Sequence, residues 1–143
     1  MTGNFMSDLH HVSIPVQSGN LSDTLQAIIN ESTSPLQITL EPGIHRCGGL
    51  RLRSNLTLEL PKGSELHFIA DYDAYAETSV SIVREESDRG MLVAANASNL
   101  KIIGGGRIFG DGAASFTHGG DADMGTLVAH KLRPRPLVLE GCR

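Results

Sequence analysis

From Leu36 onward, hydrophobic and polar residues alternate in short runs of three to five residues. Alternation with a period of two is typical of strands that bury one face. Gly, Pro or Asn separates many of these runs, as expected for tight turns. The pattern predicts eight short strands: Leu36–Leu40, Leu50–Leu52, Leu56–Leu60, Leu66–Ile69, Met91–Ala94, Leu100–Ile103, Arg107–Phe109 and Leu137–Leu139.

The first 35 residues follow a different pattern. Residues 1–20 are interpreted as a leader with one short extended segment, Val12–Val16. A helical face follows, formed by four aliphatic residues: Leu21, Leu25, Ile28 and Ile29. We expect Ser22 or Asp23 to cap this helix, and residues 32–35 to end it.

Two phrases recur along the strand-rich part. Ile-Thr-Leu-Glu-Pro-Gly at 38–43 is similar to Leu-Thr-Leu-Glu-Leu-Pro-Lys-Gly at 56–63, and Ser-Asn-Leu-Thr-Leu at 54–58 is similar to Ser-Asn-Leu-Lys-Ile at 98–102. Asn tolerates the left-handed backbone of a sharp corner, so Asn55 and Asn99 are predicted to be equivalent corners. A repeat of about 20 residues, too small to bury its own apolar side chains, indicates a coil of stacked turns.

This coil is predicted to be an all-β parallel β-helix of about four turns, with a short N-terminal capping helix. Its buried columns are expected to include Ile38, Leu40, Leu50, Leu52, Leu58, Leu60, Ile102, Ile108 and Val138. The helix would cover the open end of the first turn, because an uncovered coil end exposes unpaired backbone. The alternative is a helix packed on the flank of an ordinary sheet. The predicted organisation is a leader over 1–20, then one domain over 21–143.

Composition limits the function. The chain has 143 residues, 12 Lys and Arg, 16 Asp and Glu, and a formal net charge of −4. This balance argues against nucleic acid as a partner, and the sequence has no apolar stretch long enough to suggest a membrane span. Two distant cysteines, Cys47 and Cys142, predict reduced thiols rather than a disulfide framework or a zinc site. No secretory signal is recognised near the start, so we expect a cytoplasmic protein.

Two segments interrupt the coil, residues 70–90 and 113–135. The acidic pairs within them, Asp71 with Asp73 and Asp121 with Asp123, have a spacing that could suit two-carboxylate glycoside hydrolysis. Asp is also common in turns, which offers a structural alternative for both pairs. Arg133 and Arg135 could bind a carboxylate in a bidentate manner, or form a solvated surface.

Metal and nucleotide sites are weaker interpretations. His118, Asp121 and Asp123 lack a fourth ligand, and a metal tract at His10 and His11 is less favoured than a leader, so no metal or cofactor is predicted. Residues 104–110, Gly-Gly-Gly-Arg-Ile-Phe-Gly, lack the spacing of a dinucleotide-binding or phosphate-binding loop, and a tight glycine corner is the favoured interpretation.

Four phrases together resemble the polygalacturonase-like members of glycoside hydrolase family 28, within the pectin-lyase-like β-helix superfamily. They are LEPGIHRCGGLRLRSNLTLELPKGSELHF at 40–68, DYDAY at 71–75, NLKIIGGGRIFGDG at 99–112 and RPRPLVLEGC at 133–142. The resemblance implies a right-handed coil and inverting hydrolysis of galacturonate polymers or oligomers by paired aspartates.

The family's catalytic phrases are absent from the sequence: Asn-Thr-Asp-Gly, Asp-Asp, Gly-His-Gly and Arg-x-Lys. No catalytic residue is therefore assigned. The resemblance implies the N-terminal part of such an enzyme, truncated and inactive as a fragment, with a uronate-containing carbohydrate as the partner of the parent enzyme. Arg133, Arg135, Asp121 and Asp123 are the candidate substrate-binding residues. The alternatives are a non-catalytic assembly module that self-associates through an open C-terminal coil end, and a carbohydrate-binding module.

Overall fold

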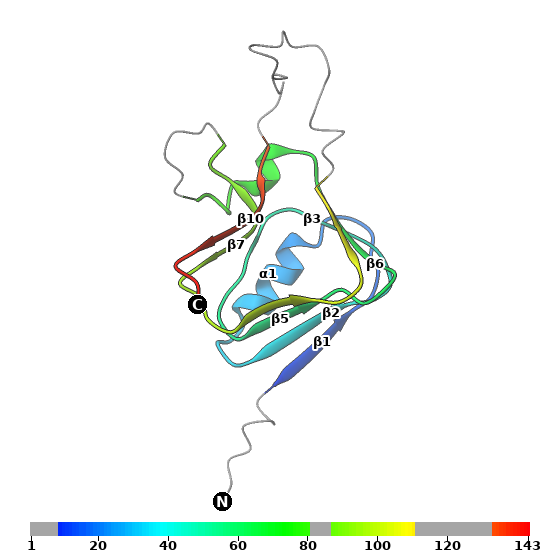
Figure 1. Ribbon diagram of the computed structural model, residues 1–143. Helices are drawn as coiled ribbons and strands as arrows, with labels where there is room; N and C mark the ends of the chain where they lie inside the picture. The colour runs from blue at the N-terminus through cyan, green and yellow to red at the C-terminus, as the bar shows by residue number, and fades with distance from the viewer. Residues whose placement is uncertain (1–8, 81–86, 111–132) are drawn as a thin grey trace, which may run out of the picture.

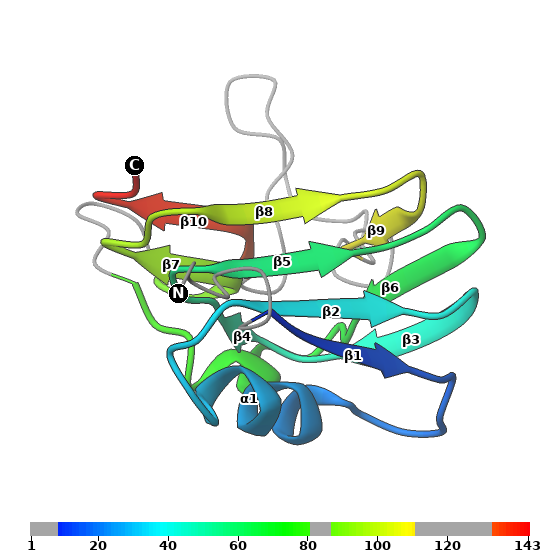
Figure 2. The same cartoon turned by 90° about the horizontal axis from the view of Figure 1, so that it is seen from below.

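A computed structural model describes residues 9–80, 87–110 and 133–143 of the chain. Figure 1 looks along the axis of a coil, and Figure 2 shows its strands stacked in successive rungs. The elements are β1 (His10–Ile14), α1 (Ser22–Asn30), β2 (Leu36–Leu40), β3 (Gly43–Cys47), β4 (Leu50–Arg51), β5 (Leu56–Glu59), β6 (Ser64–Phe68), the 3-10 helix η2 (Tyr72–Tyr75), β7 (Gly90–Ala95), β8 (Leu100–Ile103), β9 (Arg107–Phe109) and β10 (Arg135–Glu140).

The described strands form three sheets, ordered β1-β2-β5-β8, β3-β6-β9 and β10-β7-β4. Every pairing within these sheets is parallel, and strands that are neighbours in a sheet come from successive turns of the chain. The four strands of the first sheet correspond to four rungs among the described residues. The predicted all-β parallel β-helix of about four turns is thus confirmed.

The core is made of apolar columns that run through the coil. Ile38, Leu58 and Ile102 are in register on consecutive rungs of the first sheet. The six predicted core residues from Ile38 to Leu60 are all buried: Ile38, Leu40, Leu50, Leu52, Leu58 and Leu60. Stacking therefore buries side chains that a single turn would leave in water, as the repeat predicted.

Three predicted core residues differ from this expectation. Ile102 and Ile108 are 37% and 44% exposed because they lie on the last described rung, where no further rung covers them. Val138 is half-buried and is in register with Val93, outside the core cluster. Its neighbours Leu137 and Leu139 line the open end instead, so the predicted phase of β10 was wrong by one residue.

Asparagine corners form as predicted. Asn55 and Asn99 have φ of 58° and 57°, and the Asn99 amide nitrogen donates to the Asn55 side-chain oxygen at 3.2 Å. Gly104 has φ of 111°, and a Cβ there would collide with the Leu60 backbone. The glycine-rich segment is therefore a corner of the coil, in agreement with the favoured interpretation.

β3 was missed by the pattern analysis. Its residues His45 and Cys47 are fully buried, whereas Ile44 and Arg46 are exposed. The hydrophobic and polar residues thus do not separate onto the buried and exposed faces in the usual way. His45 is accommodated inside because its Nε2 lies 2.6 Å from the Glu41 carbonyl oxygen.

Helix α1 covers the N-terminal end of the coil (Figure 2). Leu21, Leu25 and Ile29 are buried in the core, which confirms a capping helix. The Gln26 amide bonds both backbone groups of Arg51 at the edge strand β4, donating to its oxygen at 2.9 Å and accepting from its nitrogen at 2.8 Å. The Gln26 side chain therefore forms the hydrogen bonds that the backbone of a neighbouring strand would otherwise make with Arg51.

The predicted N-cap was wrong. The N-cap residue is Leu21, without a side-chain capping bond, and Ser22 is the first helical residue. The Ser22 hydroxyl accepts from the Gly48 backbone nitrogen at 2.5 Å and donates to the Asn20 side-chain oxygen at 2.5 Å, so it fastens the helix to the coil. No helix among the described residues has the length and apolar character of a membrane span.

Candidate functional site

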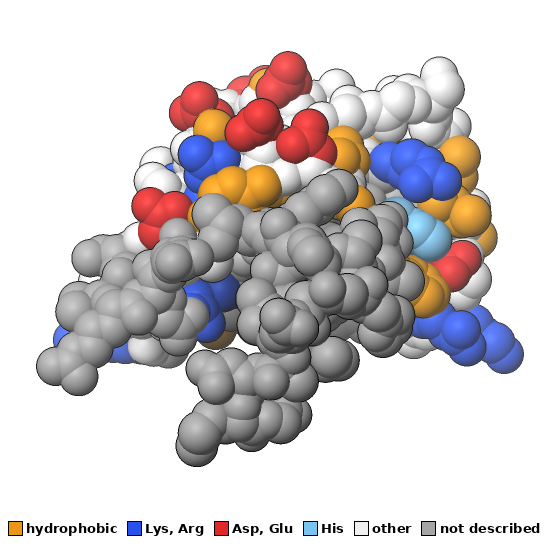
Figure 3. All heavy atoms as spheres, turned by 90° about the horizontal axis from the view of Figure 1, so that it is seen from above, with side chains coloured by type: hydrophobic (Ala, Val, Ile, Leu, Met, Phe, Trp, Pro, Cys, Tyr) orange, Lys and Arg blue, Asp and Glu red, His pale blue; other side chains and the backbone are white. Residues whose placement is uncertain are grey.

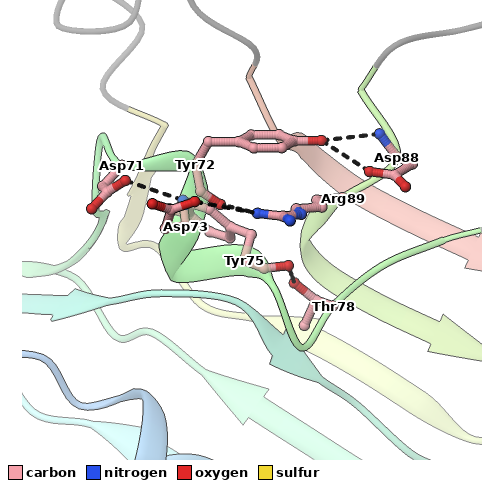
Figure 4. A network of polar contacts seen from close by, with 7 residues as sticks. All are labelled: Asp71, Tyr72, Asp73, Tyr75, Thr78, Asp88 and Arg89. Atoms are coloured by element: carbon pink, nitrogen blue, oxygen red, sulfur yellow. Dashed lines mark hydrogen bonds and ion pairs between the residues drawn. The ribbon is translucent and has the colours of Figure 1, made fainter.

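The first insertion carries a network of polar contacts, and its residues are drawn in Figure 4. It starts with η2, whose N-cap is Asp71. The Asp71 side chain accepts from the Asp73 backbone nitrogen at 3.1 Å, as short acidic side chains do in turns. Asp71 is thus used to begin the helix.

Arg89, near the end of this insertion, contacts residues near its start. Its Nη1 donates to the Tyr72 carbonyl oxygen at 2.9 Å and lies 3.9 Å from a carboxylate oxygen of Asp73. The guanidinium carbon also lies 4.4 Å from the centre of the Tyr72 ring, in a cation–π arrangement. The Asp88 side chain completes the link, since it accepts from the Tyr72 hydroxyl at 3.1 Å.

Beneath this layer, two buried hydroxyl groups fix the insertion to the coil. The Tyr75 hydroxyl donates to the Ile69 carbonyl oxygen at 2.6 Å. Thr78 is 1% exposed, and its hydroxyl lies 2.6 Å from the Gly90 carbonyl oxygen at the start of β7. The base of the insertion is therefore hydrogen-bonded to the coil at two points.

This geometry gives Asp71 and Asp73 structural partners. Asp71 caps a helix, and Asp73 faces Arg89 from a side chain that is 94% exposed. An inverting hydrolase needs one carboxyl group that holds a proton and one that activates water. The Asp73 carboxylate lies beside Arg89, and the contacts of Asp71 are those of a turn, so the structural alternative accounts for this pair.

The candidate binding residues are only partly within the described chain. Asp121, Asp123 and His118 lie outside the described residues. Arg135 is half-buried at the first position of β10, and its backbone nitrogen donates to the Arg89 carbonyl oxygen at 2.8 Å. Arg133 is exposed, and its carbonyl oxygen accepts from the Ser87 hydroxyl. Both arginines therefore join the coil beside the end of the first insertion.

The sequence analysis did not identify Tyr72, Asp88 or Arg89 as one unit. Their partners lie about 16 residues apart and meet only when the insertion closes on β7. The only available signal was the position of DYDAY at the start of a long interruption. No cluster of metal-ligating side chains is present among the described residues.

The thiols differ in environment. Burial raises the pKa of Cys47 to about 12, although its contact with the Ser22 hydroxyl acts in the opposite direction. Cys142 is half-buried at the C-terminal end of the coil. Both are free cysteines in the structure. A thiol held neutral by burial is a poor nucleophile, so Cys47 has a packing role.

Comparison with known proteins supports the fold. No family model and no curated protein matches the chain. A polygalacturonase from Erwinia carotovora ssp. carotovora superposes with a TM-score of 0.63 and 17% identity, over 92% of this chain and 40% of that protein. A proposed glycosyl hydrolase from Parabacteroides merdae superposes with a TM-score of 0.63 and 16% identity, over 91% of this chain and 59% of that protein.

The chain therefore spans 40% of the length of the first structure and 59% of the length of the second. At this level of identity, the likeness concerns the arrangement of the backbone. The parallel ladders, the asparagine corners and both superpositions agree. The chain has a parallel β-helix fold like that of the polygalacturonase, over part of the length of its structural neighbours.

Proposed function

We propose that this chain forms the N-terminal rungs of a polygalacturonase-like glycoside hydrolase that acts on galacturonate-containing polysaccharides or oligosaccharides. The observation that carries the proposal is the superposition of nearly the whole chain on 40% of a polygalacturonase. The four sequence phrases that resemble the same family support this substrate class. They come in the family's order, along the same coil.

The 143-residue chain by itself is proposed to be inactive. The family's catalytic phrases do not occur in its sequence. In the first insertion, Asp71 serves as a helix cap and Asp88 accepts a hydrogen bond from Tyr72. The chemistry would then reside on further rungs, with this portion supplying the support on which they stack.

Two measurements test this proposal. The gene is sequenced beyond the codon for Arg143; an in-frame continuation with two closely spaced aspartate-bearing strands is expected, and an in-frame stop would contradict the proposal. The purified 143-residue chain and the extended chain are then compared for release of reducing ends from polygalacturonate. Turnover by the extended chain alone is expected, and turnover by the short chain would refute its inactivity.

A second candidate function, assembly, has its own observation. At the C-terminal end, β8, β9 and β10 are edge strands of their sheets. Residues of β8 and β10 and of the adjoining turns line an open hollow of about 380 Å³, which is mainly apolar: Ala97, Leu100, Ile102, Leu137, Leu139, Cys142 and Arg143. An exposed edge beside apolar side chains favours pairing with another strand.

The occupant we propose for this end is a second copy of the chain. The same edge on another copy offers matching unpaired backbone groups, so two ends can meet around a two-fold axis. Light scattering after size-exclusion chromatography should show a concentration-dependent dimer that Leu139→Arg abolishes. A monomer at all concentrations would refute this candidate and leave the hydrolase proposal untouched.

A further inference from the structure

Two polar side chains inside the coil have an atom that needs a hydrogen-bond partner. Figure 3 shows Lys, Arg, Asp and Glu side chains on the surface of the molecule, where water can satisfy them. Among the described residues, three polar side chains are buried: His45 and Ser64, both 0% exposed, and Thr78, 1% exposed. The Thr78 hydroxyl has carbonyl partners. His45 Nδ1 and Ser64 Oγ have no hydrogen-bond partner among the described residues, which is unusual for buried polar atoms.

The inner side of the sheet β3-β6-β9 carries both side chains. Gly43 pairs with Ser64, and His45, two residues further along β3, pairs with the fully buried Leu66. Residues two apart in a strand point to the same face, so His45 and Ser64 both face the interior of the coil. Neighbouring strands lie about 4.8 Å apart, so these two side chains are separated by a single step between rungs.

The His45 ring is directed towards the level of Ser64. Its Nε2 lies 2.6 Å from the carbonyl oxygen of Glu41, which comes four residues earlier in the chain. The ring therefore points towards the Gly43 end of β3, where glycine has no side chain to occupy the inner side. Because Gly43 is in register with Ser64, this direction brings the ring and the Ser64 hydroxyl to the same part of the interior.

The chemistry of the two atoms defines what can join them. A carbonyl oxygen only accepts, so His45 Nε2 is the donor towards Glu41. In a neutral imidazole the other nitrogen, Nδ1, is then an acceptor, and the Ser64 hydroxyl can donate as well as accept. A water molecule that donates to Nδ1 and accepts from Ser64 Oγ satisfies both atoms. An ion would instead place an unpaired charge in the core, which is costly.

We propose that a single water molecule is bound inside the coil, where it bridges His45 Nδ1 and Ser64 Oγ. Buried waters typically make about three hydrogen bonds to polar groups that would otherwise lack partners. The bridge links β3 to β6, and thus one rung to the next, through side chains in addition to the backbone ladder. A slip of β3 by two residues would move His45 away from Ser64, so the bridge favours the observed register.

A crystal structure of the 143-residue chain, at a resolution that shows ordered water, tests the site directly. A density peak within hydrogen-bond distance of both His45 Nδ1 and Ser64 Oγ is expected. A peak within reach of only one of these atoms, a direct contact between the two side chains, or no peak at all would overturn the proposal.

A double-mutant cycle tests in solution whether the two side chains are coupled. Ser64→Ala is compared in the wild type and in the His45→Phe background by urea unfolding. In the wild type it should lower the equilibrium constant for folding by about fivefold, as for the loss of one hydrogen bond. In the His45→Phe background the effect should be less than about twofold, because replacing both partners by apolar groups is nearly neutral. Equal effects in the two backgrounds would overturn the proposal.

The matched control is Ser54→Ala in the same two backgrounds. The Ser54 hydroxyl also has a hydrogen-bond partner, since it accepts from the Ser98 backbone nitrogen at 3.0 Å, but this pair lies between β4 and β5 on one rung and between β7 and β8 on the next. Changes at separate sites without shared partners are additive, so the effect of Ser54→Ala should not depend on residue 45. If it does, the coupling is a general consequence of altered packing, and the proposal is overturned.

Discussion

Leu58 and Ile102 form a natural pair for measuring what stacking contributes. They are in register in one column of the first sheet, on successive rungs. Leu58 is 3% exposed, with Ile38 on the rung before it and Ile102 on the rung after it. Ile102 is 37% exposed, because one of its sides faces the open end. We expect Leu58→Ala to destabilise the protein much more than Ile102→Ala.

The magnitudes follow from burial. Truncation to Ala loses about 0.8 kcal/mol for each buried methylene group, and inside the coil a cavity penalty is added. For Leu58 the expected loss is about 3 kcal/mol, within the usual range for buried leucines. At Ile102 the transfer loss applies to about two-thirds of the side chain, and no enclosed cavity forms, so about 1.5 kcal/mol is expected.

Urea unfolding followed by far-UV circular dichroism measures both values. The slope of the free energy against urea should be the same in both variants and the wild type, so that the midpoints report stability. Equal losses at low protein concentration would refute the reasoning, because they would show that Ile102 is as fully packed as Leu58. If the gap closes only as the concentration rises, the open end is covered by a second copy.

Three further predictions use the same urea assay. Gln26→Ala removes both side-chain hydrogen bonds to the Arg51 backbone and should lower the free energy of unfolding by about 1–2 kcal/mol. Gln26→Glu, which keeps one acceptor, should fall between Gln26→Ala and the wild type. No loss would show that these hydrogen bonds at the β4 edge do not stabilise the protein. Asn55→Ala should lower the free energy of unfolding by about 1 kcal/mol more than Asn55→Gly, because φ of 58° is costly for Ala but not for Gly. Equal losses would contradict a left-handed backbone at this corner. Burial raises the pKa of Cys47 from 9.0 to about 12, so the neutral thiol should contribute its full stabilisation of the fold below pH 9.0 and lose it as pH rises towards 12. If the free energy of unfolding of Cys47→Ala falls equally steeply with pH in this range, Cys47 is not the group responsible.

The sequence repeat and the residues at its corners made the coil predictable. Asn55 and Asn99 mark equivalent corners because few other residues adopt a left-handed backbone at low cost. The bounds of β2, β8 and β9 agree with the hydrophobic alternation. These features depend on local sequence and on stacking between neighbouring rungs, and both leave a periodic signal in the chain.

Other features depend on contacts that alternation does not encode. β3 places His45 inward, where the Glu41 backbone carbonyl is a partner for one of its two ring nitrogens, Nε2. In β10, three consecutive aliphatic residues fit either phase, and the register with β7 decides that Leu137 and Leu139 face the open end. Arg89 likewise acquires its role from Tyr72, which lies across the insertion.

The two ends of the coil differ in how their edge strands and apolar side chains are covered. At the first end, α1 buries Leu25 and Ile29, and Gln26 bonds the free edge of β4. At the other end, Ile108 and Leu139 are 44% and 51% exposed, and among the described residues no helix covers them. A terminal repeat that faces water permanently is expected to be polar on its outer side. The apolar character of this end thus indicates a surface suited to being covered, either by further rungs of a longer coil or by a second copy, and the Ile102 measurement at varied protein concentration tests the second of these.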